Sequence, residues 1–125
     1  MISRIVLALL GCALVAAAHG QAYPSRAIRI VVPYAPGGTT DIVGRQMAQR
    51  MSEVLSQPVV VENRTGGNTA IGADAVARSA PDGYTLLFAS ASALAISPWL
   101  NKNLPYDTTR SFAPVAELQQ ELPSF

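Results

Sequence analysis

The sequence predicts an α/β protein with a mainly parallel sheet. Three short runs rich in β-branched and aliphatic residues have the composition of strands, at positions 28–32, 58–62 and 84–89. Two segments with the pattern and composition of helices, at positions 40–55 and 69–79, separate these runs. Strands that alternate with single helices form right-handed βαβ units, and such units build parallel sheets.

The junction between the first strand and the first helix is the most informative part of the sequence. Residues 33–41 read Pro-Tyr-Ala-Pro-Gly-Gly-Thr-Thr-Asp. A loop in this position directs unpaired N–H groups and the positive end of a helix dipole into one crevice, which suits an anion. We expect positive φ angles at Gly37 and Gly38, which also let a ligand approach the backbone closely. Thr39 and Thr40 offer a helix cap and hydroxyl groups. An ordinary strand-to-helix turn is the alternative.

The first predicted helix has one apolar and one polar face. The apolar stripe, which is expected to face the core, contains Val43, Met47, Ala48, Met51, Val54 and Leu55. The opposite face carries Arg45, Gln49, Arg50 and Glu53. In the alanine-rich second helix, Ile71, Ala75 and Val76 are expected to point inward. Residues 81–83, Pro-Asp-Gly, then end that helix and lead into the third strand.

Three loops follow the carboxyl ends of the predicted strands, where parallel sheets bind their ligands. These loops are residues 34–41, 63–69 and 90–92. The candidate ligand-binding residues in them are Tyr34, Gly37, Gly38, Thr39, Asp41, Asn68, Thr69, Ser90 and Ser92. Because only Asp41 and Arg64 are charged, we expect a small polar or anionic ligand held by amides, hydroxyls and bridging waters.

The two charged loop residues carry different expectations. Asp41 falls in the first helical turn, where a carboxylate favours the helix dipole, so it is expected to organise the loop rather than to touch an anion. Arg64 is either a solvated loop cation or a bidentate clamp for a carboxylate.

The first residues indicate export to the periplasm. Residues 1–22 have a basic start at Arg4, an apolar run too short to cross a bilayer, and small residues after it, as in a secretory signal peptide. Cleavage is expected after Gly20 or Ala22. Lipidation at Cys12 is the alternative, in which a lipid would hold the protein at the membrane.

The composition that remains after removal of residues 1–22 excludes several classes of protein. Without Arg4, eight basic residues balance eight acidic ones, so the formal charge is 8 − 8 = 0 and no basic patch indicates nucleic acid. No second apolar segment is long enough for insertion into a membrane. Loss of the one cysteine and one histidine leaves no nucleophile with a base partner, so no catalytic residue, metal or cofactor is expected. A dinucleotide-binding enzyme is the weaker alternative, because Glu62 ends a strand but the first loop lacks G-x-G-x-x-G.

Several separate blocks of sequence resemble one known family. They are residues 23–41, 59–64, 71–74, 80–87, 104–107 and 112–115. In this order they are similar to the extracytoplasmic solute-binding receptors of tripartite tricarboxylate transporters, the Bug (Bordetella uptake gene) family. The resemblance implies a two-lobed, flytrap-like periplasmic-binding fold that is not an enzyme and binds a small carboxylate between its lobes, partly through ordered water. It also implies delivery to membrane permease subunits; a receptor that serves a sensor, or an orphan receptor, is the alternative.

The chain departs from the family pattern at several positions. Residues 65–69 read Thr-Gly-Gly-Asn-Thr where the family usually has Pro-Gly-Ala-Gly-Gly, so the edge of the cleft is more polar and the identity of the carboxylate stays open. Trp99 stands where histidine is frequent, and we expect it to pack in the core beside Ile96 and Leu100. Because family members are longer, residues 23–125 are expected to be the N-terminal part of the first lobe, truncated before the second lobe.

Overall fold

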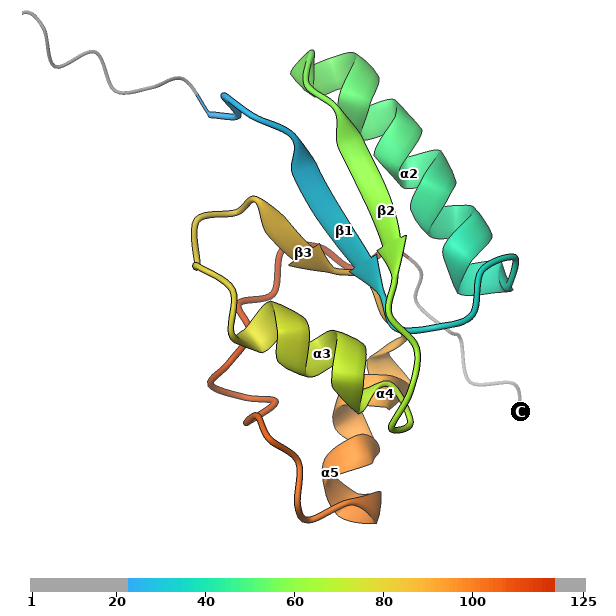
Figure 1. Ribbon diagram of the computed structural model, residues 1–125, viewed down its shortest axis with the longest axis vertical. Coiled ribbons are helices and arrows are strands. Elements are labelled where there is room, and N and C mark those ends of the chain that lie inside the picture. The colour runs from blue at the N-terminus through green and yellow to red at the C-terminus, as the bar shows by residue number, and fades with distance from the viewer. Residues whose placement is uncertain (1–22, 119–125) are drawn as a thin grey trace, which may run out of the picture.

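The computed structural model describes residues 23–118 (Figure 1). In chain order its elements are β1 (Ile28–Val32), α2 (Thr39–Leu55), β2 (Val59–Asn63), α3 (Ala70–Ala77), β3 (Thr85–Leu87), α4 (Ala91–Ala95) and α5 (Ser97–Leu100). The predicted signal peptide and the alternative lipidation at Cys12 lie outside the described residues. No helix within residues 23–118 combines the length and the hydropathy that a bilayer crossing requires.

The three strands form one parallel sheet in the order β2-β1-β3. Ile30 of β1 lies opposite Val61 of β2 on one side and Leu86 of β3 on the other. Four residues of the central strand are at most 1% exposed: Ile28, Ile30, Val31 and Val32. A strand that is covered on both faces needs apolar residues at successive positions, which β1 provides. The parallel sheet predicted from alternating strands and helices is therefore confirmed.

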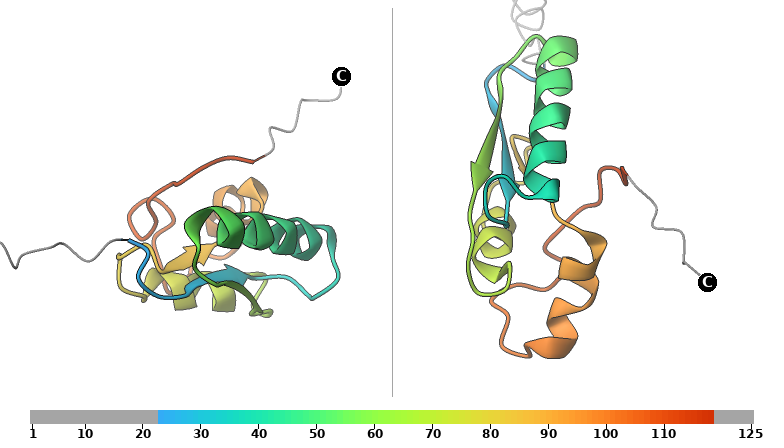
Figure 2. Two further views of the ribbon diagram at one scale, coloured as in Figure 1. Left: turned by 90° about the horizontal axis from the view of Figure 1, so that it is seen from above. Right: turned by 90° about the vertical axis from the view of Figure 1, so that its right-hand side faces the viewer.

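Helix α2 approaches one face of the sheet through small residues, while α3 lies on the other face (Figure 2). The buried positions of α2 are Asp41, Gly44 and Ala48. A Cβ atom at Gly44 would lie 3.0 Å from Cδ1 of Phe88, so glycine at this position lets the helix pack closely on the sheet. Small residues thus decide which side of α2 faces inward.

The apolar stripe predicted for α2 is correct only at its centre. Met47 and Met51 pack against the buried cluster of the sheet, as expected. Val43 and Val54 are 38% and 83% exposed, so their predicted burial is wrong. The prediction placed the large side chains at the middle of the buried face, whereas close packing at Gly44 rotates that face away from both valines.

Helix α3 packs through an even closer approach of the backbone. Its buried residues are Ala70, Gly72 and Ala73, whereas Ile71, which was expected to point inward, is 56% exposed. A Cβ atom at Gly72 would lie 2.7 Å from the carbonyl oxygen of Arg64 and 2.8 Å from Cβ of Pro33. Helix α3 therefore lies directly against the chain that leaves β1 and β2.

The segment after α5 returns to the face of the sheet that α3 covers. Tyr106 packs with the buried alanines of α3, and its ring meets that of Phe112 edge to face with 5.6 Å between centroids. Helices α4 and α5 pack on each other, and Trp99 of α5 is 84% exposed. The expectation that Trp99 packs in the core is wrong for the described residues, because the single turn of α5 packs on α4 and leaves the indole exposed.

Replacement of Gly72 by alanine should destabilise the whole protein by about 1–3 kcal/mol, because the added methyl group meets backbone on one side and a proline ring on the other. Unfolding in urea measures this difference. The control is Gly38→Ala, whose Cβ would meet nothing closer than the carbonyl oxygen of Ala35 at 3.5 Å. Equal midpoints for the two variants would show that the close approach at Gly72 is not what positions α3.

Candidate functional site

A hollow of about 270 Å³ lies at the carboxyl ends of the three strands. Its lining residues are Tyr34, Asn68, Thr69, Ser90, Ala93, Ile96, Ser97 and Leu100. Four of the predicted site residues, Tyr34, Asn68, Thr69 and Ser90, therefore come together from all three predicted loops. The other four come from α4, from α5 and from Ile96 between them. Sequence reasoning missed them, because the apolar ones had the pattern of core residues.

Asp41 organises the loop after β1. Its side chain is only 3% exposed, and Oδ2 accepts hydrogen bonds from the backbone N–H of Gly37 at 2.8 Å and from Nε of Arg45 at 2.9 Å. Oδ1 accepts a third hydrogen bond from Nδ2 of Asn63 at 2.8 Å. Asp41 does not line the hollow, and these contacts confirm the expectation that it organises the loop; contact with a ligand stays a prediction.

Asn63 closes this network at the end of β2. Its Nδ2 also donates to the carbonyl oxygen of Tyr34 at 3.1 Å, and its Oδ1 accepts from Nη2 of Arg45 at 2.8 Å. The hydrogen bond from Arg45, followed by those from Gly37 and Asn63, holds the pKa of Asp41 far below its ordinary value of 3.8. The loop after β1, the first turn of α2 and the end of β2 are thus joined through one ionised carboxylate.

The two glycines of the first loop differ from what the sequence suggested. Gly37 has φ +84°, as expected, but Gly38 has φ −75° and ψ 166°, so the expected positive φ at Gly38 is wrong. Gly38 is the N-cap residue of α2, and no side chain caps this helix end, so the expected cap from Thr39 or Thr40 is also wrong. Instead, the side chain of Asp41, in the first turn of α2, accepts the hydrogen bond from the backbone N–H of Gly37 in the loop. Gly37, Gly38 and Thr39 do not line the hollow.

The loop between β2 and α3 runs through four consecutive residues with positive φ. These are Gly66 at +118°, Gly67 at +57°, Asn68 at +52° and Thr69 at +74°. Asparagine tolerates this region, but a β-branched threonine rarely adopts it, and such strain concentrates at functional sites. Thr69 makes no side-chain cap for α3, although it precedes the helix. The strained residue therefore lines the hollow and does not cap the helix.

Arg64, which directly follows β2, is paired with an acidic residue of that strand. Its Nε donates to Oε1 of Glu62, and Glu62 also accepts from Nη1 of Arg29 at 3.3 Å. The hydrogen bond from Arg64 is the main cause of a lowered pKa for Glu62. The Arg64 side chain is 41% exposed and does not line the hollow, which agrees with the expected loop cation, here paired with Glu62; a role as a carboxylate clamp stays a prediction.

Tyr34 connects the loops after β1 and β3 across the hollow. Its hydroxyl and that of Ser90 form a hydrogen bond of 2.7 Å. The backbone of Tyr34 is bound by Asn63 and its side chain by Ser90, so all three strand ends are linked. Ser92 lies in α4, and its contact with a ligand stays a prediction.

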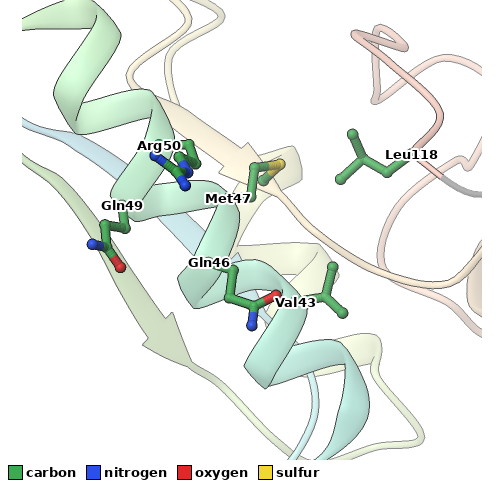
Figure 3. Close-up of a pocket in the computed structure, with 6 residues that line it drawn as sticks. All are labelled: Val43, Gln46, Met47, Gln49, Arg50 and Leu118. Carbon is green, nitrogen blue, oxygen red and sulfur yellow. The ribbon is translucent and has the colours of Figure 1, made fainter.

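A larger hollow of about 580 Å³ lies on the outer face of α2 (Figure 3). Val43, Gln46, Met47, Gln49 and Arg50 of this helix line it on one side, and Leu118 lies across from them. Among the described residues, none from the three strand-end loops lines it. We therefore assign the candidate site to the smaller hollow.

Comparison with known proteins identifies related receptors. Residues 43–123 match the model of the tripartite tricarboxylate transporter family receptor. Over 95 residues the chain is 47% identical to protein BugT of Bordetella pertussis. The aligned region covers 75% of this chain and 29% of BugT. The chain spans about 30% of the length of the curated relatives that it matches.

Two solved structures share the fold described above. The periplasmic binding protein BugD is 42% identical, with a TM-score of 0.67 over 74% of this chain and 30% of that one. MatC of Rhodopseudomonas palustris with bound malate is 36% identical, with a TM-score of 0.71 over 74% of this chain and 32% of that one. These similarities confirm the predicted fold class, a mainly parallel lobe of the periplasmic-binding-protein type.

Replacement of Asp41 by asparagine should lower the melting temperature of the whole protein near pH 7, because an amide nitrogen cannot accept the hydrogen bonds from Gly37 and Arg45. The pKa of Asp41 is lowered on folding, so its contribution is fully present above the ordinary value of 3.8 and declines as the pH falls below it. The difference in melting temperature between the wild type and Asp41→Asn should therefore be smaller at about pH 3 than at about pH 7.

The control for this comparison is Glu53→Gln, which removes one partner of an exposed ion pair with Arg50 and should change little. If Asp41→Asn lowers the melting temperature as much in acid as at neutral pH, an ionised carboxylate does not hold the network together.

Proposed function

Because the chain belongs to the tripartite tricarboxylate transporter receptor family, we propose that the whole protein is a periplasmic receptor that captures a small carboxylate in the strand-end hollow. In this proposal the receptor delivers the carboxylate to the membrane permease subunits of a tripartite transporter. Residues 1–22 serve as the signal peptide, and residues 23–125 form part of the first lobe. The malate-bound relative MatC supports a carboxylate as the ligand.

The chemistry of the hollow carries this proposal. Among residues 23–118, its lining contains hydroxyl and amide residues from all three strand-end loops and no charged residue. Hydroxyl, amide and backbone N–H groups donate hydrogen bonds to a carboxylate directly or through water, and bonds to a charged acceptor are stronger than neutral ones. A carboxylate bound in this way needs no arginine, which agrees with the pairing of Arg64 with Glu62.

The rigid parts of the site lie behind the hollow. The network around Asp41 holds the backbone of the first loop, and the bond between Tyr34 and Ser90 holds the first and third loops together. Donors that are fixed before binding lose little conformational entropy when a ligand arrives. We infer that Asp41 acts on affinity through Gly37 and Tyr34, as a positioning residue.

A thermal-shift screen of small carboxylates against the whole receptor tests the proposal. A ligand present at about 100 times its dissociation constant stabilises the folded state by about 2.7 kcal/mol. Malate, longer dicarboxylates and monocarboxylates form the screen, and amines of similar size serve as controls. Stabilisation by amines and by none of the carboxylates would contradict the proposal.

Two substitutions at Thr69 separate its hydroxyl from its backbone strain. Thr69→Gly should leave the unliganded receptor as stable as the wild type or up to about 1 kcal/mol more stable, because glycine adopts positive φ without strain. The same change should weaken carboxylate binding by about 0.5–1.5 kcal/mol through loss of one hydrogen bond. Thr69→Ser keeps the hydroxyl and should retain most of the affinity in calorimetry. Undiminished affinity in Thr69→Gly would remove this hydroxyl from the site.

A further inference from the structure

The hollow has two chemically different ends. The loop end presents Asn68, Thr69 and Ser90. The α4–α5 wall, formed by α4, α5 and Ile96 between them, contains the aliphatic residues Ala93, Ile96 and Leu100. Ile96 is 50% exposed and Leu100 is 74% exposed, so this wall is open to an occupant of the hollow and is not closed over by other described residues.

One hydroxyl on this wall also lacks a partner. Ser97 is only 5% exposed and lines the hollow. Within residues 23–118, no hydrogen bond joins its hydroxyl to another group; only its backbone carbonyl accepts one, from the N–H of Asn101. This hydroxyl can therefore form a hydrogen bond with an occupant of the hollow.

We propose that the α4–α5 wall selects the ligand: it binds the hydrocarbon part of a carboxylate whose carboxyl group lies at the loop end. This inference rests on the proposed function and names its substrate class, carboxylates with a mostly unsubstituted carbon chain. Contact with aliphatic side chains removes the hydrocarbon of the ligand from water, which favours binding. A ligand hydroxyl placed against the same side chains loses its hydrogen bonds to water and finds no other partner. Heavily hydroxylated acids of the same length are disfavoured by the same wall.

A matched pair of ligands isolates the contribution of the wall. Adipate and galactarate have the same six-carbon chain and the same two carboxylates, and galactarate differs by hydroxyl groups on the four inner carbons. In calorimetry with the whole receptor, we expect adipate to bind at least about tenfold more tightly than galactarate.

Substitutions in the wall should reduce this preference. Leu100→Thr and Ile96→Thr each replace aliphatic surface by a hydroxyl, and each should lower the ratio of the two affinities by about threefold or more. Leu100 is the safer variant for folding because it is largely exposed. Val60→Thr is the matched control, since Val60 is 55% exposed on β2 and does not line the hollow. Ser97→Ala should lower the affinity for adipate by about threefold or more, because the hydroxyl is lost.

The outcomes distinguish this inference from the function on which it rests. Selection by the wall would be overturned if the receptor bound galactarate as tightly as adipate or more tightly. It would also be overturned if neither wall variant changed the ratio of the two affinities. Binding of malate without any binding of adipate would overturn it as well, while carboxylate capture would stand. If no carboxylate binds the whole receptor, both proposals are wrong.

Discussion

The carboxylate of Asp41 joins three parts of the chain that the candidate site requires to be in fixed positions. It accepts hydrogen bonds from the loop after β1, from the second turn of α2 and from the end of β2. A buried charge is stable only where such partners compensate the loss of water. The partners are all present, and the site therefore gains a fixed backbone without Asp41 itself entering the hollow. The described residues that line the hollow are all uncharged, which suits recognition of a carboxylate by many weak donors and not by one ion pair.

Close packing by small residues places this network relative to the sheet. Gly44 lets α2 approach Phe88, and Gly72 lets α3 approach the backbone that leaves β1 and β2. Because β1 is the central strand, its carboxyl end lies between those of β2 and β3, with a loop on either side. The packing of the helices and the geometry of the site consequently depend on the same few positions.

The sequence was sufficient for the parallel sheet, because strand and helix patterns alternate clearly and parallel strands align their carboxyl ends. It also indicated the organising role of Asp41, since the position in the first helical turn is a local feature. It could not give the contact between Asp41 and Asn63, which are 22 positions apart. It failed on Val54 and Trp99, because hydrophobic character predicts burial only where packing provides a partner. The wall of α4 and α5 was missed for the related reason that a ligand-facing aliphatic residue has the same sequence pattern as a core residue.

A crystal structure of the whole receptor with a bound carboxylate tests the central claim most directly. The account predicts that the carboxylate oxygens lie about 2.7–3.2 Å from hydroxyl, amide or water donors at the loop end of the hollow. The hydrogen bonds of Asp41 with Gly37, Arg45 and Asn63 should be unchanged. A ligand bound along the outer face of α2, or one held directly by Arg64 with its pair to Glu62 broken, would contradict the account.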